Sequence, residues 1–187
     1  MKKYHHFKGS ALSKYEKVQR RVVEILLNSK LLDSKRESSI VFELKHSSEC
    51  VQVARILAQK RHLDVGIAEV AAVLHDIYVI VEGTYKNHGK LGGPIAEKIL
   101  KEIDGFSSTE IKLISEAVAH HSEKDIYTNK PYVELVKDVD VLDCSFFEHA
   151  EEEYKRIKSP ALFNEYEKRV IKVRKELGLP DKHVFRT

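Results

Sequence analysis

The sequence predicts an all-α protein. Apolar residues recur at spacings of three and four along most of the chain, which is the period of one face of a helix. No segment alternates convincingly between apolar and polar residues, as a half-buried strand would. With 187 residues, the chain is long enough to bury a sizeable core in one domain. We therefore expect residues 1–187 to form a single domain built as a bundle of helices.

The first part of the chain predicts three helices. Residues 13–32 form an amphipathic helix, and the polar stretch 33–39 forms a loop after it. Residues 44–61 form a second, long helix with an apolar stripe on one side. Residues 64–77 hold an almost unbroken apolar run, so we expect this third helix to lie at the centre of the bundle.

The middle of the chain continues the pattern. Residues 82–87 predict a loop, and 90–103 predict a helix, although Pro94 can lie only in a first turn or at a kink. The segment 107–110, Ser-Ser-Thr-Glu, has the pattern of a capping box that starts another helix. Pro131 starts the next one.

The remainder, 145–178, predicts one or two charged helices. Ser159 and Pro160 mark a break between them, and Gly178 ends the last helix. These helices carry aromatic as well as charged residues. We expect them to cover the C-terminal side of the core, and their exposed charges could support a homodimer.

Composition excludes several classes of protein. A hydrophobic content of 42% with 33% charged residues is ordinary for a globular protein. No apolar stretch reaches transmembrane length, and residues 1–6 lack the apolar core of a signal peptide. Cys50 and Cys144 do not form a redox or metal pair motif. We therefore expect a cytoplasmic protein with no membrane partner, and a net charge of +3 does not predict nucleic-acid binding.

The adjacent pair His75-Asp76 is the most informative feature. It follows the apolar run 68–74, where an unpaired histidine and carboxylate would be costly to bury. Further histidines and an aspartate lie at helix-like apolar positions on both sides of the pair. In chain order, the candidate set is His46, His75, Asp76, His88, His120, His121 and Asp140. Nitrogen and carboxylate donors in this mixture suit a first-row transition metal.

A second interpretation treats these histidines as separate core residues, each bonded to a main-chain carbonyl. For a single histidine that interpretation is the better one. For the whole set it is not, because several donor residues that face one core must meet each other or a metal ion.

The local contexts carry a resemblance to a known family. They are K-H46-S-S-E-C, A-A-V-L-H75-D76-I, N-H88-G-K-L-G-G, A-V-A-H120-H121-S and V-K-D-V-D140-V-L-D. In order and surroundings they resemble the HD domain superfamily of metal-dependent phosphohydrolases, with a core over about 44–144. The resemblance implies a single HD-domain helical bundle, here with an extra N-terminal helix at 13–32 and extra C-terminal helices at 145–178.

The resemblance also implies roles for the donors. The first His, the His-Asp pair and the last Asp of such proteins hold one metal ion, which here implies His46, His75, Asp76 and Asp140. A second ion would be held by His88 and by His121, His120 or both, with Asp76 as the bridge. The implied cofactor is one or two divalent ions of Mn, Fe, Co, Ni or Zn.

Other residues near the candidate set are less favoured as metal ligands. Asp138 and Asp143 flank Asp140, and we expect them to face solvent, to cap a helix or to support a ligand from behind. Cys50 and Cys144 each follow a donor by one helical turn, and we interpret them as core residues.

A phosphohydrolase also needs positive charge near the phosphate. We name Lys90 as the first choice for substrate binding, with Lys124 and Arg55 as further candidates, although each alone is more simply a surface charge. Asp76 is the expected catalytic residue. Two ions would lower the pKa of a shared water and neutralise charge on the phosphoryl group.

The leading hypothesis is therefore a metal-dependent phosphohydrolase that cleaves a phosphate ester or anhydride of a nucleotide or related small molecule with a metal-activated water. An HD-fold diiron oxygenase has a similar donor set, and a non-catalytic metal- or nucleotide-sensing module is a third hypothesis. The basic residue that many catalytic relatives carry shortly after His-Asp is missing here, where Ile77-Tyr78 follow. That difference leaves the substrate open.

Overall fold

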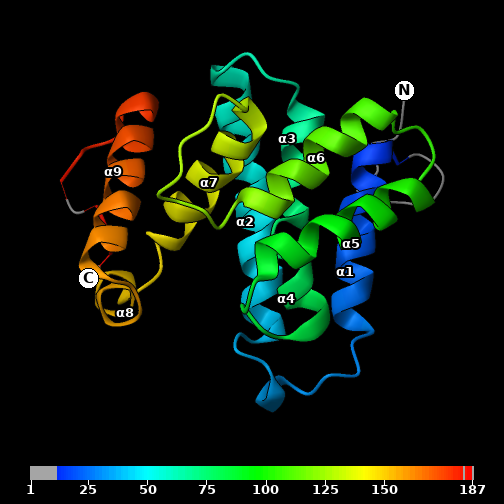
Figure 1. Ribbon diagram of the computed structural model, residues 1–187, viewed down its shortest axis with the longest axis horizontal. Coiled ribbons are helices and arrows are strands. Elements are labelled where there is room, and N and C mark those ends of the chain that lie inside the picture. The colour runs from blue at the N-terminus through cyan, green and yellow to red at the C-terminus, as the bar shows by residue number, and fades with distance from the viewer. Residues whose placement is uncertain (1–11, 183, 187) are drawn as a thin grey trace, which may run out of the picture.

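The computed structural model describes residues 12–182 and 184–186, and over these residues it contains helices and no strand (Figure 1). The predicted all-α class is thus confirmed. The expectation about a signal peptide concerns residues that lie outside the described ones. The helices are α1 (Lys14–Leu27), the short 3-10 helix η2 (Asp33–Lys35), α2 (Ile40–Lys60), α3 (Val65–Leu74), α4 (Ile77–Glu82), α5 (His88–Glu102), α6 (Ser108–His120), α7 (Pro131–Cys144), α8 (Ala150–Ile157) and α9 (Pro160–Leu177).

Helix α3 is the centre of the bundle, as its apolar run predicts. Every residue from Ile67 to Leu74 is buried. The helix packs against α1, α2, α6 and α7. Because α2, α6 and α7 all touch α3, their side chains can meet near its C-terminal end, where the His-Asp pair follows.

The end of α1 and the start of α2 differ from the prediction. Helix α1 ends at Leu27 instead of 32, because Asn28 caps it with both its main-chain N–H and its side-chain amide on the carbonyl of Glu24. Helix α2 begins at Ile40 instead of 44, because the Ser39 hydroxyl accepts a bond from the N–H of Phe42 and caps an earlier turn. Sequence periodicity locates helices better than it locates their caps.

The His-Asp pair lies between two helices instead of inside one. The sequence predicts a helix through residue 77, but α3 ends at Leu74 and α4 starts at Ile77. Successive side chains of a regular helix diverge by about 100°. The break at the pair lets both His75 and Asp76 face the same interior space.

Helices α5 and α6 pack very closely. Gly92 and Gly93 of α5 are buried against α6, where a Cβ atom at Gly93 would lie 3.0 Å from the Cβ of Ala119. Pro94 lies inside α5, beyond the first turn that the sequence analysis allowed. Pro94 and Lys90 are both exposed, so water can bond the carbonyl that loses its helical donor there.

The C-terminal helices follow the prediction. Ser159 caps α9 by accepting a bond from the N–H of Leu162, and Pro160 is its first residue. Gly178 ends α9 in the left-handed conformation with a φ of 73°. Helix α9 packs on α7 at one edge of the bundle, with α8 beside it (Figure 1). None of the described helices combines the length and apolar character needed to cross a membrane.

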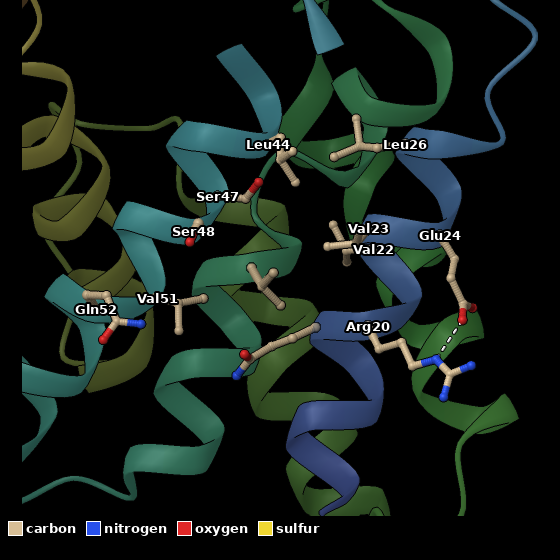
Figure 2. Close-up of a pocket in the computed structure, with 12 residues that line it drawn as sticks. Arg20, Val22, Val23, Glu24, Leu26, Leu44, Ser47, Ser48, Val51 and Gln52 are labelled. Carbon is tan, nitrogen blue, oxygen red and sulfur yellow. Dashed lines mark hydrogen bonds and ion pairs between the residues drawn. The ribbon is translucent and has the colours of Figure 1, made fainter. Parts of the chain in front are cut away.

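A groove of about 540 Å³ separates α1 from α2 (Figure 2). Its walls are largely apolar, with Val22, Leu26 and Val51 among the residues drawn. None of the histidines of the candidate set lines it. We therefore place the candidate chemistry elsewhere, at the junction of α2, α3, α5, α6 and α7.

The α5–α6 contact yields a test of the fold. We expect Gly93→Val to destabilise the protein by about 1–3 kcal/mol, a typical cost of overpacking, since the added carbons would meet Ala119 and the carbonyl of Ser115. Urea denaturation measures the effect. Lys98→Val, at an exposed position of the same helix, is the control for helix propensity. Equal stability of the two variants would refute the close contact.

Candidate metal centre

Five segments deliver donor side chains to one place. His46 comes from α2, His75 and Asp76 from the α3–α4 junction, and Asp140 from α7. His88 is the first residue of α5, and His121 directly follows α6. His46, His75, Asp76 and His121 are buried. The structure thus brings together six of the seven residues that the sequence proposed as metal ligands.

The first group contains His46 and His75. Their Nε2 atoms lie 3.0 Å apart. The Oδ2 atom of Asp76 lies 3.3 Å from Nε2 of His75 and 3.8 Å from Nε2 of His46. Oδ1 of Asp140 lies 3.6 Å from Nε2 of His46. Two carboxylate oxygens and the Nε2 atom of His75 therefore lie within 3.8 Å of Nε2 of His46, and this mixture of donors suits a metal ion.

The second group contains His88 and His121. Their Nε2 atoms are also 3.0 Å apart. The other oxygen of Asp76, Oδ1, lies 3.4 Å from Nε2 of His88 and 3.3 Å from Nε2 of His121. Each oxygen of one carboxylate thus faces its own histidine pair.

Hydrogen bonds fix which nitrogen of each ring faces inward. The Nδ1 atoms of three rings lie next to main-chain carbonyls: His75 at 2.7 Å from Ala72, His88 at 2.7 Å from Tyr85, and His121 at 2.8 Å from Val118. A carbonyl only accepts, so each Nδ1 must carry the proton. Nδ1 of His46 likewise donates to Oδ2 of Asp143 at 2.6 Å. In a neutral ring held this way, Nε2 has a bare lone pair. Burial opposes protonation of His46 and His75, but neighbouring acidic groups outweigh burial and raise both pKa values in the metal-free protein.

Bare lone pairs at such distances repel unless a cation lies between them. Burial lowers the pKa of His121 to about 4, so this ring is neutral near pH 7 and offers its lone pair. Oδ1 of Asp76 is buried and has no hydrogen-bond partner among the described residues, a costly state for a carboxylate oxygen. Burial raises the pKa of Asp76, yet His75 and His121 outweigh it and hold that pKa well below its usual range. The residues present therefore fit a metal centre.

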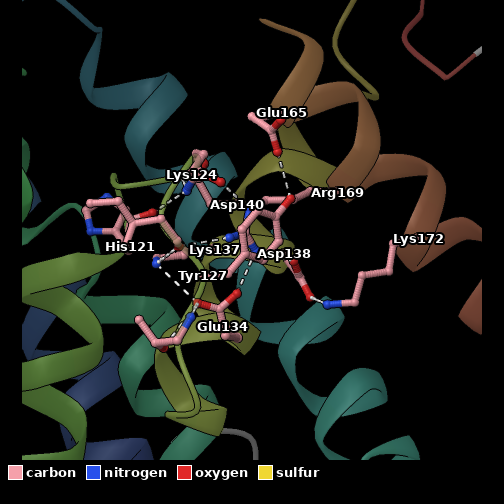
Figure 3. Close-up of polar contacts among 12 residues, drawn as sticks. His121, Lys124, Tyr127, Glu134, Lys137, Asp138, Asp140, Glu165, Arg169 and Lys172 are labelled. Atoms are coloured by element: carbon pink, nitrogen blue, oxygen red, sulfur yellow. Dashed lines mark hydrogen bonds and ion pairs between the residues drawn. The ribbon is translucent and has the colours of Figure 1, made fainter. Parts of the chain in front are cut away.

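Lys124, a predicted substrate-binding residue, has a different place. It is buried, and its ammonium donates to the carbonyl of His121 at 2.6 Å and to Oδ2 of Asp140. Burial raises the pKa of Asp140, but Lys124 and His46 outweigh burial and hold that pKa well below its usual range. The lysine thus keeps Asp140 ionised, and its donors point to protein groups (Figure 3).

Helix α9 supports Lys124 from behind. The buried Arg169 donates from Nε to the carbonyl of Lys124 at 2.7 Å, and from Nη1 to Glu134 and Asp138 at 2.9 Å each (Figure 3). Asp138 is fully buried and also bonds Arg61. The expectation that the carboxylates beside Asp140 could face solvent is therefore wrong for Asp138, because α9 covers that side of α7.

Three other candidates lie away from the centre. His120 bonds Glu123 through Nδ1 at 2.9 Å, with its side chain 44% exposed. Arg55 pairs with Glu69 at 2.5 Å, and Lys90 is exposed on α5. None of the three lines the cavity at the donors. The structure does not bring His120, Arg55 or Lys90 together with the six donors.

The centre opens into a cavity of about 700 Å³. Its floor includes His46, Asp76, His88 and Asp140. Its walls come from the 37–42 segment, from Tyr85, and from α8 and α9. The wall residues include Phe42, Tyr85, Tyr154, Ile157, Lys158 and Tyr166. The aromatic residues of the C-terminal helices thus line the entrance to the donors.

Sequence analysis missed Glu43 and Lys158. Glu43 lies one helical turn before His46 and is fully buried, and burial together with Asp76 raises its pKa to about 7. Its Oε1 accepts a bond from the Tyr85 hydroxyl at 3.0 Å, while Oε2 has no partner among the described residues. Its position on the His46 stripe was the available signal. No such signal was available for Lys158, because this residue follows a helix that contains many charged residues.

The two cysteines lie beside the donors. Sγ of Cys50 is 3.7 Å from Nδ1 of His46, and Sγ of Cys144 is 3.5 Å from Oδ1 of Asp140. Burial raises the pKa of Cys50 to about 12, and it raises the pKa of Cys144 well above its usual range. Both groups therefore stay thiols near neutral pH in the metal-free protein. Cys50 belongs to the hydrophobic core.

Comparisons with known proteins agree with this site. A family model described as HD domain matches residues 44–145. Ribonuclease Y of Chlorobium phaeobacteroides is 28% identical over 102 residues, which cover 54% of this chain and 18% of that protein. The match therefore spans less than a fifth of the length of that relative. No solved structure matches the chain.

The two histidine groups predict how bound metal responds to substitution. We expect His121→Ala and His88→Ala each to remove about one ion per chain, because each deletes a donor of the second group only. The neighbouring His120→Ala should keep the full content, because this ring faces Glu123. Elemental analysis of purified variants measures the content. Loss of metal from the His120 variant but not from the His121 variant would contradict the arrangement.

The carboxylate behind His46 gives a second test. Asp143→Asn should weaken metal binding by about 10- to 100-fold, the typical effect of removing a carboxylate that orients a ligating histidine. Competition with a chelator measures the affinity. Asp125→Asn, at an exposed position, makes the same charge change and should have no such effect. Equal affinities in the two variants would exclude this role for Asp143.

Proposed function

The chain belongs to the HD domain family, and from that premise we propose that it is a metal-dependent phosphohydrolase of small phosphate compounds. The observation that carries the proposal is the single carboxylate of Asp76, whose two oxygens face two separate histidine pairs. The HD family consists in general of metal-dependent hydrolases, and the match covers the segment that holds all six donors.

In the proposed mechanism His46, His75, Asp76 and Asp140 would hold one divalent first-row ion, and His88, His121 and Asp76 would hold a second. Such ions supply the Lewis acidity that activates water near neutral pH and offsets phosphate charge. Asp76 is the residue common to both sites, so we assign it the catalytic role. Asp143 orients His46, and Lys124 keeps Asp140 ionised.

The cavity supports a small substrate. A volume of about 700 Å³ lies within the range of pockets that bind small molecules, and aromatic side chains on its walls suit a nucleobase. The relative's name implies action on RNA. A polynucleotide needs several cationic contacts along its backbone, whereas Lys158 is the one lysine or arginine among the described lining residues, which also include Glu37 and Glu153. A mononucleotide or similar phosphate ester therefore fits better.

Substitution of Asp76 tests the proposal. We expect Asp76→Asn to lower phosphate release by orders of magnitude, because it weakens both proposed ion sites at once. The variant should stay folded, since it also removes a buried negative charge. The assay measures phosphate released from nucleoside mono-, di- and triphosphates with added manganese, and an RNA oligonucleotide serves as the competing substrate.

Two results would contradict the proposal. One is phosphate release by the Asp76→Asn variant at the wild-type rate. The other is wild-type activity that requires both iron and oxygen, which anaerobic assays would reveal. The second result would assign the same donors to a diiron oxygenase.

A further inference from the structure

Lys158 reaches the cavity from outside the matched family segment. It follows α8 directly, and its side chain lines the cavity together with His46, Asp76 and Asp140. The family match ends at residue 145, so Lys158 belongs to the C-terminal addition. Its side chain is partly buried in a wall made by α8 and α9.

The Lys158 ammonium lies among aromatic rings without an ionic partner. Its Nζ is 5.3 Å from the ring centre of Tyr166 and 5.9 Å from that of Tyr154. Within the described part of the chain it makes no side-chain hydrogen bond or ion pair, and Asp140 and Lys124 act on it only through longer-range charge. Burial is the largest influence on its pKa and lowers it, with Asp140 opposing.

The neighbouring lysine behaves differently. Lys155 of the same helix pairs with Glu151 at 2.5 Å, in the usual manner of an exposed helical lysine. Lys158 instead has its three donors unused while part of its hydration is lost. Aromatic faces attract the ammonium but provide no lone pair for its N–H groups, so an anion that enters the cavity would meet available donors.

The charges in the cavity indicate which anion. Asp76, Asp140, Glu37 and Glu153 make its lining acidic, and Lys124 is already engaged with Asp140. To bind in this acidic cavity, a carboxylate or phosphate therefore needs attraction from the bound ions and from a further cation. Phosphate offers several oxygens, so it can contact ions on one side and an ammonium on the other.

We propose that Lys158 binds the phosphoryl oxygens of the substrate on the side opposite the ions, and so selects phosphate monoesters. The proposal rests on the proposed function of the same cavity. The C-terminal helices then provide substrate selection, while the HD segment provides the ion ligands.

Metal-loaded protein allows a direct test with inorganic phosphate as the probe. Lys158→Met keeps the length of the side chain and removes the ammonium, and it should weaken phosphate binding about 10- to 100-fold in calorimetry, as expected for hydrogen bonds to charged groups. The KM for 5′-AMP should rise by a similar factor. Lys158→Arg should recover most of the affinity. Lys155→Met is the matched control and should bind phosphate as the wild type does.

Metal content and thermal melting distinguish a direct loss of phosphate binding from structural damage. Both should be unchanged in Lys158→Met. Phosphate affinity within twofold of wild type in this variant would overturn the proposal, as would a loss that accompanies lost metal in both Lys158→Met and Lys158→Gln. If the wild type hydrolyses esters while Lys158→Met retains its KM, the Lys158 assignment alone fails. If no ester is hydrolysed but phosphate binding depends on Lys158, the assignment survives and the proposed hydrolysis fails.

Discussion

The carboxylate of Asp76 is the constraint around which the centre is arranged. Its oxygens face opposite histidine pairs, and the two pairs come from α2 with the α3–α4 junction and from α5 with α6. Helices α2, α5 and α6 must therefore bring their histidines to the one side chain that the α3–α4 junction supplies. A site of this kind tolerates little movement of any contributing helix, because metal bonds have narrow distance ranges.

Two local features allow that convergence. The interruption between α3 and α4 lets His75 and Asp76 face one space. The small residues Gly92 and Gly93 let α5 approach α6, which brings His88 at the start of α5 to His121 at the end of α6. The interruption carries two of the donors itself, whereas the glycines carry none, yet both features decide whether the donors meet. Gly92 and Gly93, which are poor helix formers, thus have a geometric role.

The spacing of apolar residues was enough to predict the helical class. The order of histidines and aspartates, through its resemblance to the HD superfamily, was enough to predict the six donors that converge. The partners of Lys124 and Asp138 could not be predicted in the same way. Both contacts depend on Arg169 of α9. The periodicity of one helix does not show which charged residue of a distant helix will pack against it. The exposed position of Lys90, which does not line the cavity, could not be predicted either, because residues two apart on a helix do not face each other.

The same contacts couple the C-terminal helices to the centre. Arg169 neutralises the buried Asp138 and binds the carbonyl of Lys124, and Lys124 in turn bonds Asp140. A buried carboxylate without its cation is strongly destabilising, so α7 needs α9 even though the family match ends before it. Helix α9 therefore has two effects on one site. It supports Lys124, the lysine that keeps Asp140 ionised, and with α8 it contributes aromatic residues to the lining of the cavity at the donors.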